Sequence, residues 1–449
     1  MEIKRQVIEQ LIDWKNAPHR KPLVLQGARQ VGKTWILKVF GQTQFESFAV
    51  FNFDENPELK GFFTSTKDVK RILQNLSLLH GKTIQPQKTL IIFDEIQECN
   101  EALNSLKYFY EEAPEYCIAC AGSLLGVAMS CGSSFPVGKV DFMQIHPVSF
   151  FEFLEAAEPE LAAYLDSITA IEPIPEIFFN RLLERFRMYY ISGGMPEAIS
   201  VLLDEGDIAR VQGVLRAILN AYALDFSKHA ENKDIPKIGY IWNSLPSQLA
   251  RENKKFLYQT VRLGARAREY EDALLWLTNA GLVYRIYRSI KPGLPIKSYD
   301  DLSAFKVYSL DVGLLRRQSG LAPSAIAEGN RLLTEFKGAL TENYILESLV
   351  RQFEGMPRYW TSGNSAEVDF LIQVDNDIIP VEVKSDENIA GKSLAFYRRE
   401  HSPKLAIRYS LRNFKKDEEL INIPLFMADM TSMILQWEPL VTGDKPIGN

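Results

Sequence analysis

Short apolar runs alternate with amphipathic stretches over residues 1–150. The apolar runs predict strands at 23–25, 48–53, 90–93 and 116–121. Apolar residues at helical spacing predict helices at 3–14, 35–40 and 100–112. Strands that alternate with helices predict a parallel sheet covered by helices on both faces, so residues 1–150 are expected to form one α/β domain.

Helical patterns dominate the next part of the chain. Helices are predicted at 149–155, 177–190 and 197–203, with a break at Gly193-Gly194-Met195-Pro196. We therefore interpret residues 151–233 as a helical appendage of the first domain.

A different order of elements begins at Asp234. Three short helices are predicted at 238–249, 258–263 and 270–280. Alternating strands at 282–287 and 304–308 are expected to pair across a turn-rich region that contains Lys291-Pro292-Gly293. Three helices and a hairpin predict a winged helix-turn-helix domain over residues 234–328.

The last part of the chain returns to an α/β pattern. A long amphipathic helix is predicted at 333–353, followed by a hairpin of strands 368–374 and 378–384 around Asp375-Asn376-Asp377. A helix at 388–399 and a strand at 405–410 follow. Residues 329–449 are thus expected to form a fourth domain, with 442–449 as a loose tail.

Composition indicates an ordinary soluble protein of more than one domain. The chain has 449 residues, of which 46% are hydrophobic and 24% charged. No apolar run approaches the roughly 18 residues that a membrane span needs, and Met1-Glu2-Ile3-Lys4-Arg5 is charged where a signal peptide would be apolar. We therefore expect a cytoplasmic protein without a membrane partner.

Charge and cysteines make two functions less favoured, DNA binding over the whole surface and zinc binding. The formal net charge is −6, so any contact with DNA must come from a local basic patch. Cys117 and Cys120 form a C-x-x-C pattern, but they lie in an apolar strand and no second ligand pair is near. Core thiols in a reducing compartment are the default interpretation, and a zinc site the less favoured one.

The chemistry that organises the chain lies between the first strand and the helix after it. The pattern G-x-x-x-x-G-K-T there is the phosphate-binding P-loop, whose residues are Gly27, Ala28, Arg29, Gln30, Val31, Gly32, Lys33 and Thr34. Glycines let backbone N–H groups surround a phosphate chain at a helix N-terminus. Lys33 is expected to reach the β- and γ-phosphates of ATP, and the Thr34 hydroxyl to bind Mg²⁺. Residues 151–233 would then form a lid over the nucleotide.

Two acids end the strand at 90–93, as in the Walker B pattern. Asp94 is expected to hold Mg²⁺, and Glu95 to orient and deprotonate the attacking water. An acid directly after Asp94 favours an ATPase over a small-molecule kinase, whose nucleophile comes from the substrate.

Two further polar residues are candidates for the same site. Ser123 follows the strand at 116–121 and is predicted to contact the γ-phosphate or the attacking water, although serine at a strand end is also a common turn residue. Lys139 either adds positive charge beside the phosphates or is an ordinary solvated lysine.

Arginines gather in the predicted winged helix. They are Arg262, Arg266, Arg268, Arg285 and Arg288, with Lys291 close by in sequence. As phosphate contacts they would serve DNA binding. Because Glu269, Glu271 and Asp272 lie among them, a winged helix used for protein packing is an equal alternative.

A second chemical pattern occupies the last hundred residues. Asp369 lies on one strand of the predicted hairpin, and Glu382 and Lys384 share a face of the next, while Glu342 lies on the preceding helix. This order of acids and lysine is the active-site pattern of PD-(D/E)XK nucleases. Asp369 and Glu382 would hold Mg²⁺, and Lys384 would place the nucleophile. A solvated edge strand that ends in E-x-K is the alternative, and cleavage by such a fold is uncertain.

Taken together, these motifs resemble a widespread prokaryotic family of AAA+-like ATPases, similar to the archaeal ATPase clade. Its members end in a domain of unknown function related to Holliday-junction-resolvase-type nucleases. The segments that carry the resemblance are residues 27–34, 93–97, 193–196, 368–370 and 381–384. It implies ATP binding and hydrolysis at Lys33, Thr34, Asp94 and Glu95, a winged helix, and a restriction-endonuclease-like domain. That last domain would carry Glu342, Asp369, Glu382 and Lys384. Lys139 departs from the arginine expected at its position.

The main functional hypothesis is a DNA-associated ATPase whose nucleotide state gates a metal-dependent nuclease-like domain. One alternative is an ATP-driven regulatory or assembly switch whose C-terminal domain binds DNA or a protein without cleaving. Another is a signalling ATPase with no nucleic-acid partner. A homo-oligomer is compatible with each, and the sequence singles out no arginine that would act on a neighbouring subunit.

Overall fold

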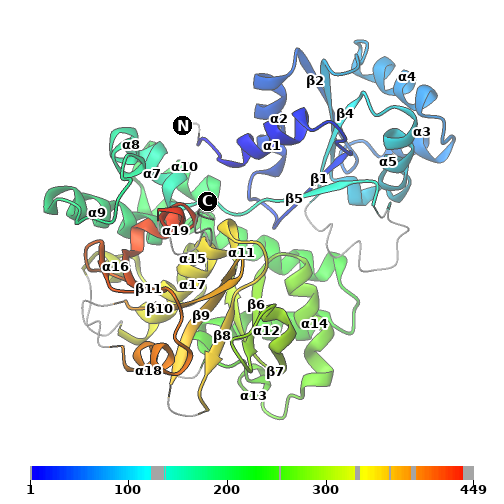
Figure 1. The fold of residues 1–449 in the computed structure, drawn as a ribbon. Helices are drawn as coiled ribbons and strands as arrows, with labels where there is room; N and C mark the ends of the chain where they lie inside the picture. The colour runs from blue at the N-terminus through cyan, green and yellow to red at the C-terminus, as the bar shows by residue number, and fades with distance from the viewer. Residues whose placement is uncertain are drawn as a thin grey trace, which may run out of the picture. The chain divides into compact units, whose positions relative to one another are not determined.

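The computed structural model describes residues 3–122, 136, 138–251, 254–328, 334–363, 366–385 and 391–437. Contacts divide the chain into two compact units. The N-terminal unit comprises Lys4–Pro147 and Asn279–Leu282, and the C-terminal unit comprises Met1–Ile3, Val148–Thr278 and Val283–Asn449. Each unit is built on its own sheet (Figure 1).

The sheet of the N-terminal unit is parallel, as the alternation of strands and helices predicts. Its strands are β1 (Leu23–Gln26), β2 (Ser47–Asn52), β3 (Thr89–Asp94), β4 (Cys117–Ala121) and β5 (Asp141–Gln144). Their order is β2-β3-β4-β1-β5, and every pairing is parallel. The carboxyl-terminal ends of β1 and β3 therefore lie on the same side of the sheet, with β4 between the two strands.

Helices cover both faces of this sheet. They are α1 (Val7–Asn16), α2 (Lys33–Gln44), α3 (Lys60–Thr64), α4 (Val69–His80) and α5 (Asn100–Glu112). Ile91 and Phe93 of β3 belong to a core shared with α3, α4 and α5. Because strand side chains alternate, Leu90 and Ile92 point to the opposite face, and both are fully buried. The helix predicted at 3–14 begins four residues later, at Val7.

The cysteines of this unit are core residues. Cys99, Cys117 and Cys120 are buried and free, and burial raises the pKa of each thiol. These three are therefore core thiols, as expected; Cys131 lies outside the described residues.

A mixed sheet of eight strands forms the C-terminal unit, in the order β12-β13-β11-β10-β9-β8-β6-β7. Their bounds are β6 (Val283–Ser289), β7 (Asp300–Ser309), β8 (Arg358–Thr361), β9 (Glu367–Val374), β10 (Asp377–Val383), β11 (Ala406–Ser410), β12 (Lys415–Asp417) and β13 (Leu420–Pro424). The β9–β10 hairpin turns at Asp375 and Asn376, as predicted, and β11 pairs with β10 in parallel.

Many helices surround this sheet. They are α7 (Phe150–Ala157), α8 (Pro159–Asp166), α9 (Glu176–Ser192), α10 (Pro196–Glu205), α11 (Ile208–His229), α12 (Ile235–Leu249), α13 (Tyr258–Val261), α14 (Ala267–Asn279), α15 (Val312–Gln318), α16 (Pro323–Glu328), α17 (Thr334–Gln352), α18 (Lys392–His401) and α19 (Thr431–Gln436). The break between α9 and α10 falls at the predicted Gly193-Gly194-Met195. Sequence analysis missed α11, although the spacing of its buried residues Val211, Leu215, Ile218, Tyr222 and Phe226 could have revealed it.

The predicted β6–β7 hairpin is present, but it is not an isolated wing. Tyr284 pairs with Tyr308 and Tyr287 with Phe305, as the alternating pattern suggested. On its other side β6 pairs in parallel with β8, so the hairpin is one edge of the eight-stranded sheet. The three predicted helices α12, α13 and α14 precede it. A separate winged-helix domain or a restriction-endonuclease-like domain is not shown, and the domain boundaries stay a prediction.

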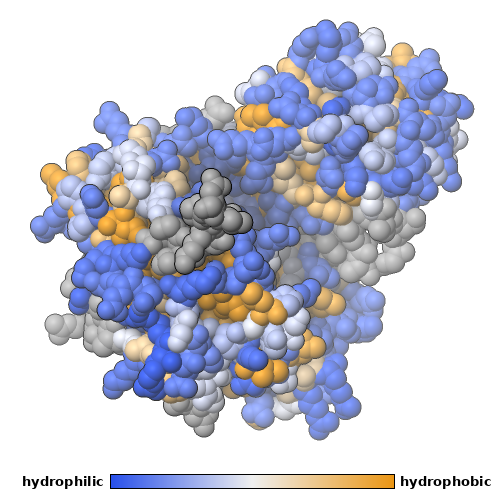
Figure 2. Space-filling view, viewed as in Figure 1, coloured by the Kyte–Doolittle hydropathy of each residue, from blue (hydrophilic) through white to orange (hydrophobic). Residues whose placement is uncertain are grey.

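No helix in the part of the chain that the structure describes is long and apolar enough to cross a membrane. The face visible in Figure 2 is mostly hydrophilic, with apolar areas scattered between the polar ones.

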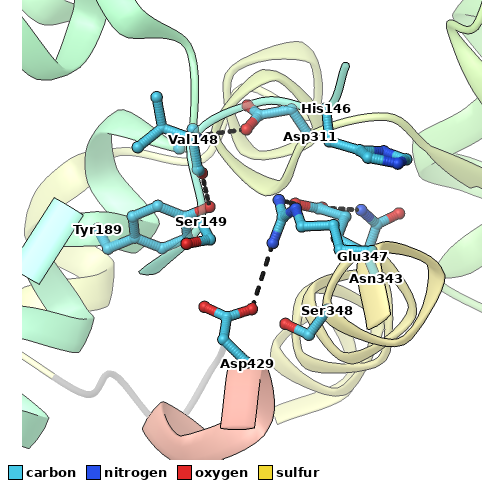
Figure 3. A network of polar contacts seen from close by, with 12 residues as sticks. His146, Val148, Ser149, Tyr189, Asp311, Asn343, Glu347, Ser348 and Asp429 are labelled. Atoms are coloured by element: carbon cyan, nitrogen blue, oxygen red, sulfur yellow. Dashed lines mark hydrogen bonds and ion pairs between the residues drawn. The ribbon is translucent and has the colours of Figure 1, made fainter. Parts of the chain in front are cut away.

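Gly193 is required by its surroundings. Its φ is 65°, and an added Cβ would lie 2.3 Å from Oδ1 of Asp311 and 2.7 Å from the Cα of Gly313. The neighbouring Gly194 N–H donates to Oδ2 of Asp311 at 2.5 Å. The glycine pair therefore lets α9 end directly against the start of α15, and Figure 3 shows Asp311 in the polar network at this point.

We expect Gly193→Ala to destabilise the protein far more than Gly206→Ala. Gly206 has left-handed backbone (φ 67°, ψ 8°), where alanine costs about 1 kcal/mol, whereas Gly193 (φ 65°, ψ −163°) has a conformation that is essentially restricted to glycine and costs alanine more. Only at Gly193 does the Cβ also meet neighbouring atoms, which should raise the loss to roughly 3 kcal/mol or more. Thermal unfolding followed by circular dichroism measures both, and equal shifts in melting temperature would refute the close packing.

Candidate functional site

The P-loop folds as its glycines predict. It runs from the end of β1 to α2, and Gly32 caps α2 with a left-handed φ of 94°. A Cβ on Gly27 would lie 2.3 Å from the carbonyl oxygen of Ile145, directly after β5. Gly27 is thus needed for packing of the loop against β5, and Gly32 for its turn into the helix.

Lys33 is held inside this loop. It is 7% exposed, and its Nζ donates to the carbonyl oxygens of Gly27 at 2.8 Å and Ala28 at 2.7 Å. Burial lowers the pKa of Lys33 to about 8, while the charges of Glu95 and Asp94 oppose that shift. An ammonium desolvated in this way gains strongly from a phosphate charge.

The sheet order brings Thr34 and Asp94 together. Thr34 Oγ1 donates to Oδ1 of Asp94 at 2.8 Å, and Nδ2 of Asn52 lies 3.5 Å from Oδ2 of Asp94. Burial raises the pKa of Asp94, and the Thr34 hydrogen bond opposes this. A hydroxyl and a carboxylate side by side are the oxygen ligands that Mg²⁺ prefers, so these residues fit the metal that accompanies a nucleotide.

Glu95 has an unusual backbone conformation, with φ 48° and ψ 44°. Its Oε2 accepts a hydrogen bond from Nε2 of Gln97 at 2.6 Å, within the short helix η2 (Ile96–Glu98) that follows. Left-handed backbone in a residue other than glycine is uncommon and gathers at functional sites. Sequence analysis missed the roles of Asn52 and Gln97, although both stand at or just past strand ends.

The two remaining candidates of this site turn out differently. Ser123 lies outside the described residues. Lys139 precedes β5, at the opposite edge of the sheet from the P-loop, where its Nζ lies 2.8 Å from Oε1 of Glu111. Of the two equal alternatives, the structure agrees with a surface lysine and not with a place beside the phosphates.

In the C-terminal unit, Glu342 of α17 is 7% exposed and is bound by cations. Lys254 forms an ion pair with its Oε1, and the Tyr308 hydroxyl donates to its Oε2 at 3.2 Å. Lys254 and the charge of Lys306 lower the pKa of Glu342 against the effect of burial. Sequence analysis missed all three partners, because they come from α12–α13 and β7, far from Glu342 in sequence.

Asp369 lies near this cluster. Its Oδ2 accepts from the Val383 N–H at 2.8 Å. Burial, and next the charge of Glu342, raise the pKa of Asp369 to about 7, against the charges of Lys306 and Lys254. The fully buried Lys306 forms an ion pair with Glu367. The structure thus brings Glu342 and Asp369 close together, surrounded by lysines.

Glu382 and Lys384 pair with each other. Lys384 Nζ lies 3.0 Å from Oε1 of Glu382, and Nε of Arg408 lies 3.6 Å from its Oε2. Glu382 is 3% exposed. Among residues that the structure describes, no three His, Cys, Asp or Glu side chains are grouped so that they could hold a metal ion. Of the predicted nuclease residues, Glu342, Glu382 and Lys384 take part in ion pairs and Asp369 accepts a hydrogen bond from the Val383 N–H, so their role as metal ligands stays a prediction.

Most of the N-terminal unit matches a known family. Residues 19–154 match the family model of an AAA domain. Residues 183–325 and 337–426 match two further models, each described as a domain of unknown function, DUF8612 and DUF4143. Among curated proteins there is no match.

Solved structures with some likeness are distant in sequence. The Walker-type ATPase of Pyrococcus abyssi is 14% identical, with a TM-score of 0.45 over 71% of this chain and 96% of that chain. A signal transduction ATPase with a tetratricopeptide repeat sensor from Pyrococcus horikoshii is 12% identical, with a TM-score of 0.28 over 79% and 46%. The Orc1 protein of Aeropyrum pernix, solved with DNA, is 12% identical, with a TM-score of 0.25 over 70% and 91%.

The N-terminal unit is a P-loop ATPase domain. The order of its strands, the loop before α2 and the AAA match agree on this class, which binds ATP. The chain as a whole joins an AAA domain to two segments that match domains of unknown function.

Removal of the Lys254 charge tests whether the C-terminal cluster is a true buried ion pair. The side chains of Lys254 and Glu342 are 12% and 9% exposed, so Lys254→Gln should leave a buried carboxylate without its main cation and destabilise the unit by about 3 kcal/mol. Lys404→Gln is the matched control, because its pair with Asp377 has a 57% exposed lysine and should contribute less than about 1 kcal/mol. Urea unfolding measures both, and similar losses would contradict the buried pair.

Proposed function

We propose that this protein binds and hydrolyses ATP in its N-terminal unit and binds DNA through its C-terminal unit without cleaving it. The observation that carries the ATPase proposal is the hydrogen bond between Thr34 and Asp94, with Glu95 next in the chain. It supports Thr34 and Asp94 as a pair of metal ligands beside the P-loop, with Glu95 as the candidate base.

Each residue of the site has a distinct task in hydrolysis. The backbone N–H groups of 27–34 and the Lys33 ammonium bind the phosphates. Thr34 and Asp94 would hold Mg²⁺, which would neutralise phosphate charge. Glu95 accepts the proton of the attacking water, and Gln97 keeps that carboxylate in place through its hydrogen bond.

The DNA part of the proposal rests on the segment from the end of α13 to the first turn of α14. Arg262, Arg266 and Arg268 are exposed there, and Leu263 between them is 96% exposed. Two other arginines of the predicted group are neutralised, since Arg285 pairs with Glu271 and Arg288 with Asp301. Exposed arginines at a helix-turn-helix connection suit phosphate contacts.

The ion pairs of the C-terminal unit support binding without cleavage. Glu342 pairs with Lys254, and Glu382 pairs with Lys384, so a lysine already balances the charge of each carboxylate. Metal-dependent cleavage is the rival function for the same residues.

Glu95→Gln should separate ATP binding from ATP turnover. A glutamine keeps the shape but cannot take the proton, so turnover should fall about 100-fold or more while affinity stays within a few-fold. Phosphate release measures turnover, and titration with a fluorescent ATP analogue measures binding. Glu98→Gln, in the same short helix, is the matched control and should keep its turnover; equal activity of both variants would refute the role of Glu95.

The double variant Arg266→Ala/Arg268→Ala should weaken DNA binding and its dependence on salt. Two lost phosphate contacts should lower the slope of log K against log salt by about 2. Fluorescence anisotropy with labelled linear and branched DNA, at several salt concentrations, measures this. Arg399→Ala is the control, because this 71% exposed arginine lies on α18.

The same DNA, incubated with Mg²⁺ or Mn²⁺ with and without ATP, distinguishes the rival functions. Retarded DNA that stays intact supports the proposal. Cleavage that disappears in Glu382→Ala would replace it with an ATP-coupled nuclease. No binding at low salt would favour an ATPase without a nucleic-acid partner.

A further inference from the structure

Arg5 connects the P-loop to the end of β5. This arginine precedes the segment that matches the AAA family model and is only 8% exposed. Its Nη1 donates to the carbonyl oxygen of Val31 at 3.0 Å, and its Nη2 donates to the carbonyl oxygen of His146 at 2.7 Å. One planar cation thus joins a peptide of the P-loop to a residue more than a hundred positions away in sequence.

The bond to Val31 touches the phosphate-binding surface itself. The carbonyl of Val31 and the N–H of Gly32 belong to one peptide group, and in a planar trans peptide they point in opposite directions. Any rotation that aims the Gly32 N–H at a phosphate therefore also turns the carbonyl that Arg5 holds. A charge-assisted hydrogen bond on that carbonyl resists such a rotation or moves with it.

The bond to His146 lies beside a crossing between the units. The chain crosses after Ile3, after Pro147 and at either end of Asn279–Leu282. Arg5 is two residues beyond the first crossing, and its partner His146 directly precedes Pro147. Proline fixes its own φ and restricts the residue before it, so the chain at 146–147 is stiff.

Val148, the first residue after the crossing, makes hydrogen bonds within the C-terminal unit. The Val148 N–H donates to the carbonyl oxygen of Gly194 at 2.7 Å, and the Tyr189 hydroxyl donates to the carbonyl oxygen of Val148 at 2.7 Å. Gly194 is in turn bound to the buried Asp311. Figure 3 shows Val148, Tyr189 and Asp311 in this network. The three residues 146–148 are thus anchored at both ends.

We propose that Arg5 is a positioning residue that transmits the nucleotide state of the P-loop to the link at 146–148 and so to Gly194. The proposal rests on nucleotide binding at the P-loop, but on neither hydrolysis nor DNA. It gives a role to the Gly193-Gly194 break, because the Gly194 carbonyl accepts the hydrogen bond from Val148. A purely structural Arg5 would only hold α1, which has separate attachments through Trp14 to Lys21 and Lys15 to Gln44.

Hydrogen exchange of the full-length protein, with and without ATPγS, tests the transmission. The amides of Val148 and Gly194 are the reporters, since both donate hydrogen bonds at the far end of the link. In the wild-type protein, saturating nucleotide should change their exchange rates at least several-fold. In Arg5→Lys, which lacks the planar guanidinium whose two nitrogens each bind one of these carbonyls, ATPγS should still bind, measured by calorimetry, but the change should be lost.

Arg20→Lys is the matched control. Arg20 also donates to backbone carbonyls, those of Lys15, Pro114 and Glu115, within the same unit. It should respond like the wild type. A second variant, Pro147→Gly, keeps the Arg5 bonds but loosens the link, so it should bind nucleotide normally and lose the response at Gly194; it decides the question if Arg5→Lys does not fold.

Two results would overturn the proposal. One is a wild-type protein that binds ATPγS with no change at Val148 and Gly194. The other is a nucleotide-bound Arg5→Lys or Pro147→Gly variant that responds as fully as the wild type. Neither result depends on phosphate release or DNA binding, so failure here is distinguishable from failure of the proposed function.

Discussion

The hydrogen bond between Thr34 and Asp94 is the contact on which the nucleotide site depends. It joins residues 60 positions apart, which lie at the ends of two parallel strands that only β4 separates. The parallel strands bring the ends of β1 and β3 to one edge, and β5 beside β1 supports the loop, with the Ile145 carbonyl directly behind Gly27. The site is thus a property of strand order as much as of the P-loop motif.

The C-terminal unit depends on a different constraint, the burial of many charges. Glu347, Arg351 and Asp429 form one group: Nη2 of Arg351 lies 3.6 Å from Glu347 and its Nη1 lies 3.4 Å from Asp429. Burial, and then the charge of Asp311, raise the pKa of Glu347 well above its ordinary value, although Arg351 opposes this. Buried ions are strongly destabilising unless they are paired. The same rule applies to Glu342 and Asp369: the charges of Lys254 and Lys306 offset the free-energy cost of burying these two carboxyl groups.

Sequence predicted the features that depend on neighbours in the chain. The P-loop, the acids after β3, the α9–α10 break and the β6–β7 and β9–β10 hairpins follow from local spacing, and each is present. The pairing of β6 with β8 was not predictable, because alternation indicates a strand but not its distant partner. Lys306 shows the same limit: a lysine within an apolar strand is read as solvated, yet this one is fully buried against Glu367.

The two units meet different demands at the same short stretch of chain. On one side, Arg5 binds the Val31 carbonyl of the P-loop and the His146 carbonyl just before Pro147. On the other side, Val148 leads into α7, which begins with the capping box of Ser149 and Glu152. Because Val148 is bonded to both Gly194 and Tyr189, it cannot shift without moving the α9–α10 break. The absence of a Cβ at Gly193 lets Asp311 approach closely enough to bind the Gly194 N–H. Residues 146–148, the Gly193-Gly194 break and Asp311 are therefore connected through hydrogen bonds and close packing, so a shift in one is expected to move the others.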